Sequence, residues 1–229
     1  MISSNKRYYL TDDYACSYLE GRTARSEVAH PLLARHEFSE LIRKGFRRSG
    51  FFVYRPACQN CTACIAVRVD AAAFLPNRSQ KRCLIGNERL EVVARPPVPD
   101  SEHLALYNRY QNARHPVGGM AGDAQYEALL ETQVNTTLYE FREGDALRMV
   151  SIVDETDDGL SSVYAFFDPD AHSAGLGTYN ILWQIELCRK LDLPYVYLGY
   201  WVKDCRKMSY KRNFNPIEGY QNGAWRKLT

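Results

Sequence analysis

The chain has 229 residues, of which 45% are hydrophobic and 24% charged, and its formal net charge is +2. This composition is typical of a folded globular protein and excludes a disordered or collagen-like chain. Three of the seven cysteines fall within one seven-residue run, which is unlike the cysteine spacing of a secreted disulfide framework. Because no secretory signal and no long apolar run is visible, we expect a cytoplasmic protein that contacts no membrane.

The stretch before residue 50 is expected to contain a loop, over residues 21–30, and then an amphipathic helix. From His36 onward the apolar residues recur at helical spacing: Phe38, Leu41, Ile42, Gly45 and Phe46. The cations of this stretch lie largely off that face: Arg43, Lys44, Arg47 and Arg48. Two interpretations stay open, an ordinary helix with a solvated face or a surface that binds nucleic-acid phosphate.

A short strand over residues 51–54 precedes two C-x-x-C steps that share a cysteine. The thiolates of Cys58, Cys61 and Cys64 can converge on zinc or an iron–sulfur cluster if a distant fourth ligand joins them. Cys16 and Cys83 are the candidates for that fourth ligand. Reduced structural thiols are the alternative interpretation of the same spacing.

Residues 65–69 predict another strand, and a helix is expected to start after Asn77, which can cap it. Arg78, Lys81 and Arg82 crowd the first turns of this helix. Cations at a helix N-terminus oppose the helix dipole, so an anionic partner explains them better than stability does.

From residue 87 the patterns predict one strand (91–94), two helices (from Ser101, and from Asp123 to Val134) and three strands joined by hairpin turns (137–141, 147–153 and 160–167). The acidic connection at 154–159 is expected to be a solvated loop. A loop with Gly175 and Gly177, a helix over 181–191 and a strand over 195–201 follow, and a ligand is expected where this loop meets the helix. The basic run after that strand suggests an anionic substrate, with a solvated helix as the alternative.

This order of elements resembles the N-acetyltransferase-like (GNAT-like) fold. We therefore expect a mixed α/β (α+β) chain with a smaller, cysteine-containing N-terminal domain (1–86) and a GNAT-like domain (87–229). In that fold the acyl donor lies where two strands splay apart, and here these strands are 160–167 and 195–201. The loop over 168–177 lacks the arginine or glutamine expected for coenzyme A pyrophosphate, which disfavours acyl-CoA as the donor.

Several stretches resemble the aminoacyl-tRNA–protein transferases of the N-end degradation pathway, most closely the bacterial aspartate/glutamate leucyltransferase branch. They include Cys16-Ser-Tyr-Leu19, Gly50-Phe-Phe-Val-Tyr-Arg-Pro56, Arg78-Ser-Gln-Lys-Arg82, Leu176-Gly-Thr-Tyr179, Tyr195-Val-Tyr-Leu-Gly-Tyr-Trp201 and Lys207-Met-Ser-Tyr-Lys211. One departure is Leu19, which stands where the eukaryotic arginyl members have the second cysteine of C-G-Y-C. The short chain and the cysteine run resemble the bacterial branch, which implies leucine as the transferred residue.

The resemblance implies attack by a protein's N-terminal amine on the ester of leucyl-tRNA, with N-terminal Asp or Glu as acceptor and no cofactor required for the chemistry. Donors for the developing oxyanion are expected from Tyr164, Tyr179 and Tyr200. The expected acceptor- or tRNA-binding residues are Arg43, Lys44, Arg47, Arg78, Ser79, Lys81, Arg82, Lys207, Tyr210 and Lys211. The candidate ligands of a zinc or iron–sulfur site are Cys16, Cys58, Cys61 and Cys64.

No general base can be assigned, although Asp168 and His172 lie in the loop before the expected ligand site. An arginyl-tRNA donor keeps the family and changes the substrate. Two other classes stay open: an acyl-CoA-dependent N-acetyltransferase and a non-catalytic, metal-dependent RNA-binding module.

Overall fold

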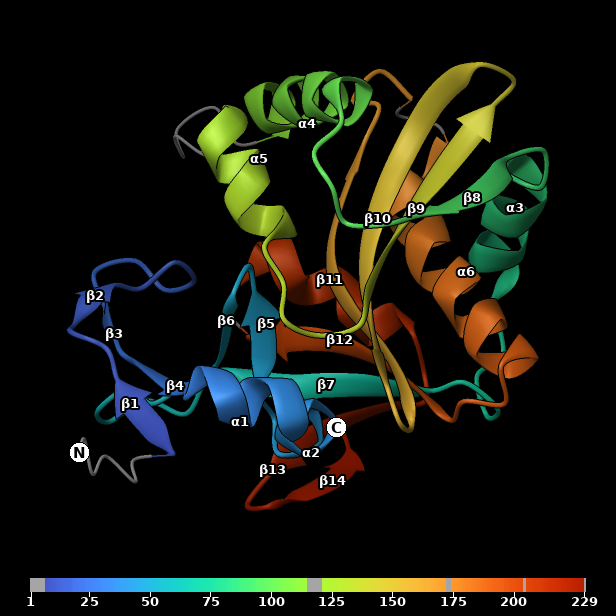
Figure 1. Cartoon of the computed structure of the whole chain (residues 1–229). Coiled ribbons are helices and arrows are strands. Elements are labelled where there is room, and N and C mark those ends of the chain that lie inside the picture. Colours follow the sequence, from blue (N-terminus) through green and yellow to red (C-terminus); the bar gives the residue numbers. More distant parts are fainter. Residues whose placement is uncertain (1–6, 115–120, 172–173, 204, 229) are drawn as a thin grey trace.

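An eight-stranded mixed sheet runs through the molecule in the order β14-β13-β7-β12-β11-β10-β9-β8 (Figure 1). The computed structural model describes residues 7–114, 121–171, 174–203 and 205–228. The strands of this sheet are β7(Ile65–Asp70), β8(Glu91–Arg95), β9(Thr136–Glu143), β10(Ala146–Thr156), β11(Gly159–Phe167), β12(Tyr195–Trp201), β13(Ile217–Gln221) and β14(Ala224–Lys227). Since β7 lies between β12 and β13, the sheet draws strands from both sides of residue 86. The division of the chain into domains at that residue stays a prediction.

Four strands of the first 60 residues form a second sheet in the order β1-β4-β6-β5. They are β1(Tyr8–Leu10), β4(Ser26–Ala29), β6(Phe52–Pro56) and β5(Arg47–Ser49), while β2(Tyr14–Ala15) and β3(Thr23–Ala24) pair with each other. The prediction of a loop over residues 21–30 is therefore wrong. Its residues become strands because they pair with β1 and β6, and such long-range pairing overrides local sequence preference.

The helix expected to carry four basic residues is shorter than its apolar pattern suggested. After α1(Pro31–His36), α2(Phe38–Arg43) ends where the chain turns at Gly45, which has a φ of +81°. Glycine adopts this left-handed conformation without strain, and a Cβ there would approach the Tyr220 ring to 3.0 Å. Arg47 and Arg48 consequently lie on β5, so the prediction that they share a helix with Arg43 and Lys44 is wrong.

Helices α3, α4 and α5 begin close to the predicted positions, whereas α6 begins at Leu176, five residues before the predicted span of 181–191. In α3(Arg78–Gly86), Asn77 and Gln80 form a reciprocal capping box with both bonds at 2.9 Å. The carboxylate of Asp100 caps α4(Ser101–Arg114), and α5(Asp123–Leu130) ends four residues before the predicted Val134. The last two are α6(Leu176–Lys190) and the 3-10 helix η2(Arg206–Asn213).

The order of strand, two helices, three antiparallel strands, helix and parallel strand confirms the predicted GNAT-like arrangement. Helix α6 covers one face of the large sheet, whereas α4 and α5 cover the other (Figure 1). On the first face α6 buries Ile181, Leu182 and Ile185, and on the second Tyr107 and Tyr126 pack against the strands. Each fully buried aliphatic side chain of this kind contributes about 1.5–3 kcal/mol to stability.

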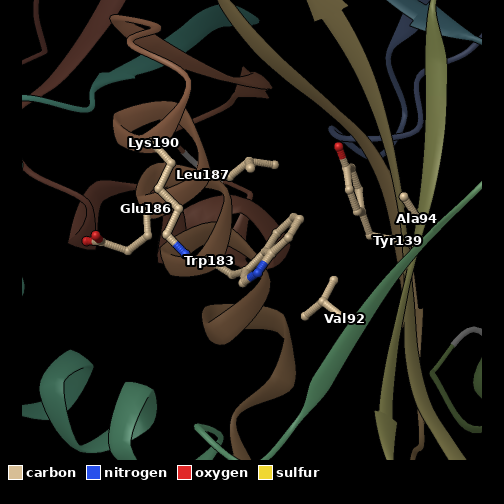
Figure 2. Close-up of a pocket in the computed structure, with 7 residues that line it drawn as sticks. All are labelled: Val92, Ala94, Tyr139, Trp183, Glu186, Leu187 and Lys190. Carbon is tan, nitrogen blue, oxygen red and sulfur yellow. The ribbon is translucent and has the colours of Figure 1, made fainter.

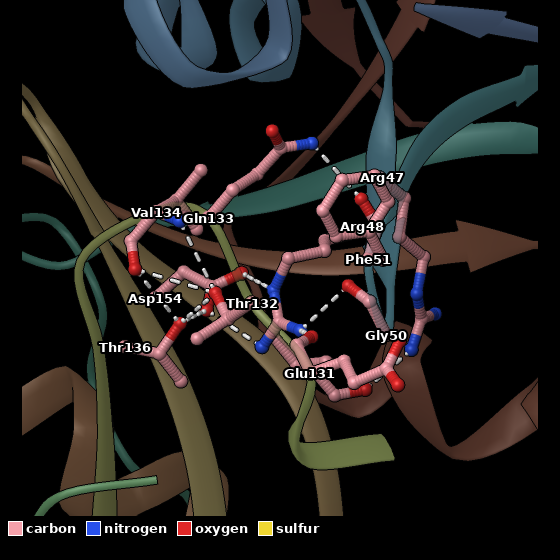
Figure 3. A network of polar contacts seen from close by, with 11 residues as sticks. Arg47, Arg48, Gly50, Phe51, Glu131, Thr132, Gln133, Val134, Thr136 and Asp154 are labelled. Atoms are coloured by element: carbon pink, nitrogen blue, oxygen red, sulfur yellow. Dashed lines mark hydrogen bonds and ion pairs between the residues drawn. The ribbon is translucent and has the colours of Figure 1, made fainter. Parts of the chain in front are cut away.

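A buried ion pair joins β5 to β10 (Figure 3). Arg48 donates to both carboxylate oxygens of Asp154 at 2.7 and 2.9 Å, and both side chains are fully buried. Arg48 also donates to the carbonyl oxygens of Gly50 and Glu131, and the Thr136 hydroxyl donates to Asp154. Asp154 was expected in a solvated acidic loop, and that expectation is wrong. The pair fixes β5 against the large sheet and thereby sets the position of the neighbouring Arg47.

Candidate functional site

The splay between β11 and β12 is the feature that organises the candidate site. The two strands pair only where residues 159–161 meet residues 195–197, and they diverge beyond that point. A bulge interrupts the pairing of β11 with β10, because Ile152 faces Tyr164 while Val153 faces Ser162. Val163 is therefore an extra residue whose carbonyl oxygen is not taken by the β10 ladder.

Arg47 bridges the two diverging strands. Its Nη2 donates to the carbonyl oxygen of Val163 on β11 at 2.6 Å. Its guanidinium lies against Gly199 on β12, where a Cβ would stand only 2.1 Å from Nη1. Gly199 also has a φ of +71°, so both its conformation and its closeness to Arg47 require glycine. The Arg47 side chain extends away from the Arg48–Asp154 pair, as expected for adjacent strand residues (Figure 3).

Tyr164 is the predicted tyrosine best placed to donate to a developing oxyanion. Its hydroxyl accepts a hydrogen bond from Nε2 of Gln111 on α4 at 3.0 Å. Among the described residues, no acceptor for its own proton lies within hydrogen-bond distance. Burial raises the pKa of Tyr164, and the nearby Arg47 charge only partly opposes this, so the hydroxyl stays protonated at neutral pH.

Tyr200 lies beside Arg47 but is engaged by the backbone. Its hydroxyl donates toward the carbonyl oxygens of Gly45 and Tyr54, at 3.0 and 3.1 Å, and its side chain is fully buried. Burial holds the pKa of Tyr200 well above its ordinary value. Tyr200 therefore fastens β12 to the β5–β6 hairpin, and its single proton is already donated.

Tyr179 is not brought to the other two predicted tyrosines. It lies on α6, on the opposite face of the sheet from α4, where its ring contacts Phe141 at a centroid distance of 5.9 Å. In the loop before α6, Asp168 accepts from Arg109 and Arg148 at 2.8 Å each, which engages its carboxylate in ion pairs. His172 lies outside the described residues.

Lys211 is buried, unlike the other basic residues of η2. Its side chain is only 4% exposed and its ammonium donates to the carbonyl oxygen of Tyr200. Burial lowers the pKa of Lys211 to about 7, and the Arg47 charge adds to this. Lys211 therefore anchors η2 to the end of β12, while the adjacent Tyr210 is exposed.

Five of the six exposed cations on α3 and η2 form one basic surface, and the sixth, Arg212, lies over the Trp201 ring at 5.5 Å. Its members are Arg78, Lys81, Arg82, Arg206 and Lys207, and none has a carboxylate within 4.0 Å among the described residues. Gln80 Nε2 donates to the carbonyl oxygen of Asn213 at 2.9 Å, which holds the start of α3 against the end of η2. We call these five residues the α3–η2 basic surface, beside which Ser79 is also exposed.

Arg43 and Lys44 are instead paired with acidic side chains. Arg43 contacts the carboxylates of Glu40, Asp157 and Asp158, and Lys44 lies 3.9 Å from Glu40. Their charges are thus compensated within the chain, in contrast to those of the α3–η2 basic surface.

Four of the predicted cysteines gather in the N-terminal region, and all seven are free thiols. Burial raises the pKa of Cys64 to about 12, and Cys16, Cys58, Cys61 and Cys205 raise it further through their charges. Cys83 lies elsewhere, on α3, where its thiol donates to the carbonyl oxygens of Ala174 and Gly175. Within the described ranges, no three Cys, His, Asp or Glu side chains are spaced to hold a metal ion.

Two cavities lie on the α6 face of the sheet, away from Arg47. One cavity of about 270 Å³ lies between α6 and the strands β8 and β9 (Figure 2). Its lining consists of Val92, Ala94, Tyr139, Trp183, Glu186, Leu187 and Lys190. A second cavity of about 290 Å³ shares Trp183 and Glu186 with it. Neither brings together groups suited to acyl transfer, so we place the candidate site at the splay.

The two strands expected to splay, 160–167 and 195–201, do diverge in the structure, but the sequence does not reveal that Arg47 and Gln111 lie beside them. The apolar spacing places Arg47 on a helix, and nothing in the sequence marks Gln111, a single helical glutamine, as functional. Tyr18 was also missed as a site residue, although it belongs to a stretch that carries the family resemblance. Burial raises its pKa to about 12, and among the further influences Arg47 lowers it, which places Tyr18 near the same guanidinium.

Comparisons with known proteins match nearly the whole chain. The family model described as "Arginine-tRNA-protein transferase, N terminus" matches residues 14–82, and the one described as "Arginine-tRNA-protein transferase, C terminus" matches residues 102–221. No described helix is both long and apolar enough to cross a membrane. A solved structure titled "The structure of L-PGS from Bacillus licheniformis" covers 60% of this chain and 46% of its own at 12% identity, and its TM-score of 0.47 is too low to bear on function.

Three curated relatives are each named aspartate/glutamate leucyltransferase. The protein from Thiobacillus denitrificans is 52% identical and the match covers 97% of this chain and 95% of the relative. The proteins from Nitrosospira multiformis and Chromobacterium violaceum are 49% and 47% identical to this chain. These matches cover 99% and 96% of this chain, and 92% and 93% of the respective relative. On these matches, the chain belongs to the arginine-tRNA-protein transferase family.

Proposed function

We propose that the chain transfers leucine from leucyl-tRNA to the N-terminal Asp or Glu of acceptor proteins, which creates a destabilising N-terminus for N-degron degradation. The names of the curated relatives support leucine as the donor residue and Asp or Glu as the acceptor. The observation that carries the proposal is the splay, where the Arg47 guanidinium bonds the carbonyl oxygen of Val163, the residue before Tyr164, and its charge acts on the Tyr164 hydroxyl. We further propose that the reaction takes place in the cytoplasm, where charged tRNA is found.

The aminoacyl ester is already activated, so the reaction depends mainly on aligning the acceptor amine with the ester carbonyl. The acceptor's uncharged amine attacks the ester carbonyl carbon, a C–N bond forms, and the bond from that carbon to the ribose 3′ oxygen breaks. The amine loses one proton and the ribose oxygen gains one, so the exchange is balanced. Tyr164 donates a hydrogen bond to the oxyanion that develops on the way, and holding both substrates in line supplies much of the remaining acceleration.

The α3–η2 basic surface suits the phosphates of the donor tRNA. Its cations are exposed and uncompensated, which is the arrangement that attracts a polyanion without reading its sequence. Part of this surface lies on η2, and Lys211 of the same helix is bonded to the end of β12. A strand of tRNA lying on this surface would therefore reach toward the splay with its charged end.

The zinc or iron–sulfur site predicted from Cys16, Cys58, Cys61 and Cys64 stays a proposal. The grouping of these thiols around Cys64 supports it, whereas the spacing of the described side chains does not fit a bound ion. Iron and zinc analysis of anaerobically purified protein tests the site, and substoichiometric metal would speak for plain thiols.

The direct test is mass spectrometry of a peptide with N-terminal Asp, incubated with the protein and leucyl-tRNA. A matched peptide that starts with Gly and a parallel reaction with arginyl-tRNA serve as controls. We expect a leucine mass on the acidic peptide alone. An arginine mass would keep the family and change the donor, and no mass gain with either tRNA would refute the proposed transfer.

The α3–η2 basic surface makes a second prediction. Replacing Arg78 or Lys207 by Ala should weaken leucyl-tRNA binding about threefold to tenfold at moderate salt, because each removes one phosphate contact. The slope of log affinity against log salt should also become shallower by about 0.7–0.9 for each lost contact. Filter binding over a salt series measures both, with Lys44→Ala as the paired control. Unchanged affinity and slope in both variants would move the tRNA to another face.

A further inference from the structure

Arg47 lacks the acidic partner that its neighbouring arginines have. Arg43 pairs with Glu40, Arg48 with Asp154 and Arg55 with Glu27. Among the described residues no carboxylate lies within 4.0 Å of the Arg47 guanidinium, although its side chain is half-buried. A partly desolvated charge is costly unless it is paired, so an uncompensated guanidinium at this position points to an anionic ligand.

The guanidinium is also held in place. The bond to the Val163 carbonyl and the contact with Gly199 hold it from two strands, whereas the cations of the α3–η2 basic surface are exposed and lack such contacts. A planar guanidinium in a fixed orientation is suited to bidentate recognition of a carboxylate. Flexible exposed cations are sufficient for phosphate contacts that carry no sequence information.

The reactants offer two kinds of anion. Phosphates are spread along the tRNA and have the α3–η2 basic surface as their counterpart. The acceptor's side-chain carboxylate is only three bonds from the attacking amine in Asp and four in Glu. Its receptor must therefore lie next to the oxyanion donor, and Arg47 is the uncompensated cation that reaches the splay beside Tyr164.

We propose that Arg47 determines acceptor specificity by binding the side-chain carboxylate of the N-terminal Asp or Glu. This inference rests on the proposed leucine transfer and names the residue that chooses its acceptor. An amide at the same place has one acceptor oxygen and no charge, so it cannot form the bidentate ion pair with the guanidinium, and N-terminal Asn and Gln are rejected. Glycine at position 199 is then required because any side chain would displace this receptor.

The test is the ratio of kcat/KM for an Asp-started peptide to that for its Asn-started twin, with leucyl-tRNA as donor. In Arg47→Gln we expect this ratio to fall roughly 100-fold, mainly through loss of the acidic peptide, because the charged contact is gone. The affinity for leucyl-tRNA should change less than about threefold, because in this proposal Arg47 binds the acceptor and not a tRNA phosphate. Mass spectrometry over long incubations follows the slow peptide.

Two further variants separate specificity from folding. Arg55→Gln removes the same charge from the adjacent strand, where Arg55 pairs with Glu27, and should leave the ratio unchanged. Arg47→Lys keeps the charge without the planar fork and should lower the ratio about tenfold, with a thermal midpoint close to that of the parent.

The outcomes distinguish the role of Arg47 from the proposed leucine transfer. A folded Arg47→Gln that keeps its Asp preference overturns the inference, as does one that loses both peptides equally or loses tRNA affinity instead. If the parent protein transfers no leucine to either peptide, the proposed function itself fails. A parent that is active and selective, with a variant that is active and unselective, supports both.

Discussion

Replacing Asp154 by Ala is expected to lower the free energy of unfolding by about 3–5 kcal/mol, which is the usual cost of removing one partner of a buried ion pair. Arg48 would then remain fully buried without its carboxylate, since its other bonds within the described part of the chain go to the carbonyl oxygens of Gly50 and Glu131. The loss falls on β5, which this pair ties to β10. A substantial fraction of a typical domain's stability would disappear through one side chain.

Urea unfolding followed by circular dichroism measures the effect. The control is Glu40→Ala, which removes an exposed partner of Arg43 and should leave the free energy of unfolding nearly unchanged. The double variant Arg48→Met with Asp154→Leu removes both charges and should recover much of the loss, because apolar pairs often replace buried ion pairs without penalty. A cost below 1 kcal/mol for Asp154→Ala would mean that water enters and solvates Arg48.

Local patterns were sufficient to predict the part of the fold that surrounds the splay. The alternation over 160–167 and the apolar spacing over 181–191 correspond to β11 and α6, and the polar cap at Asn77 starts α3 as expected. These signals work because strands and helices bury one face with a fixed period. The family resemblance added the reaction, which no periodicity contains.

Contacts between residues distant in sequence were not predictable. Arg48 and Asp154 are 106 positions apart, and nothing in either neighbourhood reveals the other. The apolar period of α2 continues past Gly45 in the sequence, so Arg47 was assigned to a helix although the positive φ of that glycine ends it. Tyr164 and Tyr179 looked equivalent as site residues, and only the sheet reveals that they lie on opposite faces.

We expect the free energy of unfolding to depend on pH through the titration of Lys211. Burial lowers its folded-state pKa to about 7 from an ordinary 10.5. Between these values the unfolded chain binds the proton more fully than the folded chain does. The destabilisation by Lys211 is therefore fully present below about pH 7. It decreases as the pH rises from there toward 10.5, the pKa of the lysine in the unfolded chain. Between pH 6 and pH 9 the stability of the protein should gain about 2 kcal/mol from this one group.

The variant Lys211→Met is compared with the parent by urea unfolding at pH 6 and pH 9. Methionine matches the length of the lysine stem but cannot titrate. The variant's free energy of unfolding minus that of the parent should therefore be about 2 kcal/mol larger at pH 6 than at pH 9. Lys207→Met, an exposed change in the same short helix, should show no such difference. A gap that stays constant across the two pH values for Lys211→Met would mean that this ammonium remains charged and hydrated inside the fold. In that case, η2 would be held to Tyr200 by an ion with its own water rather than by a buried amine.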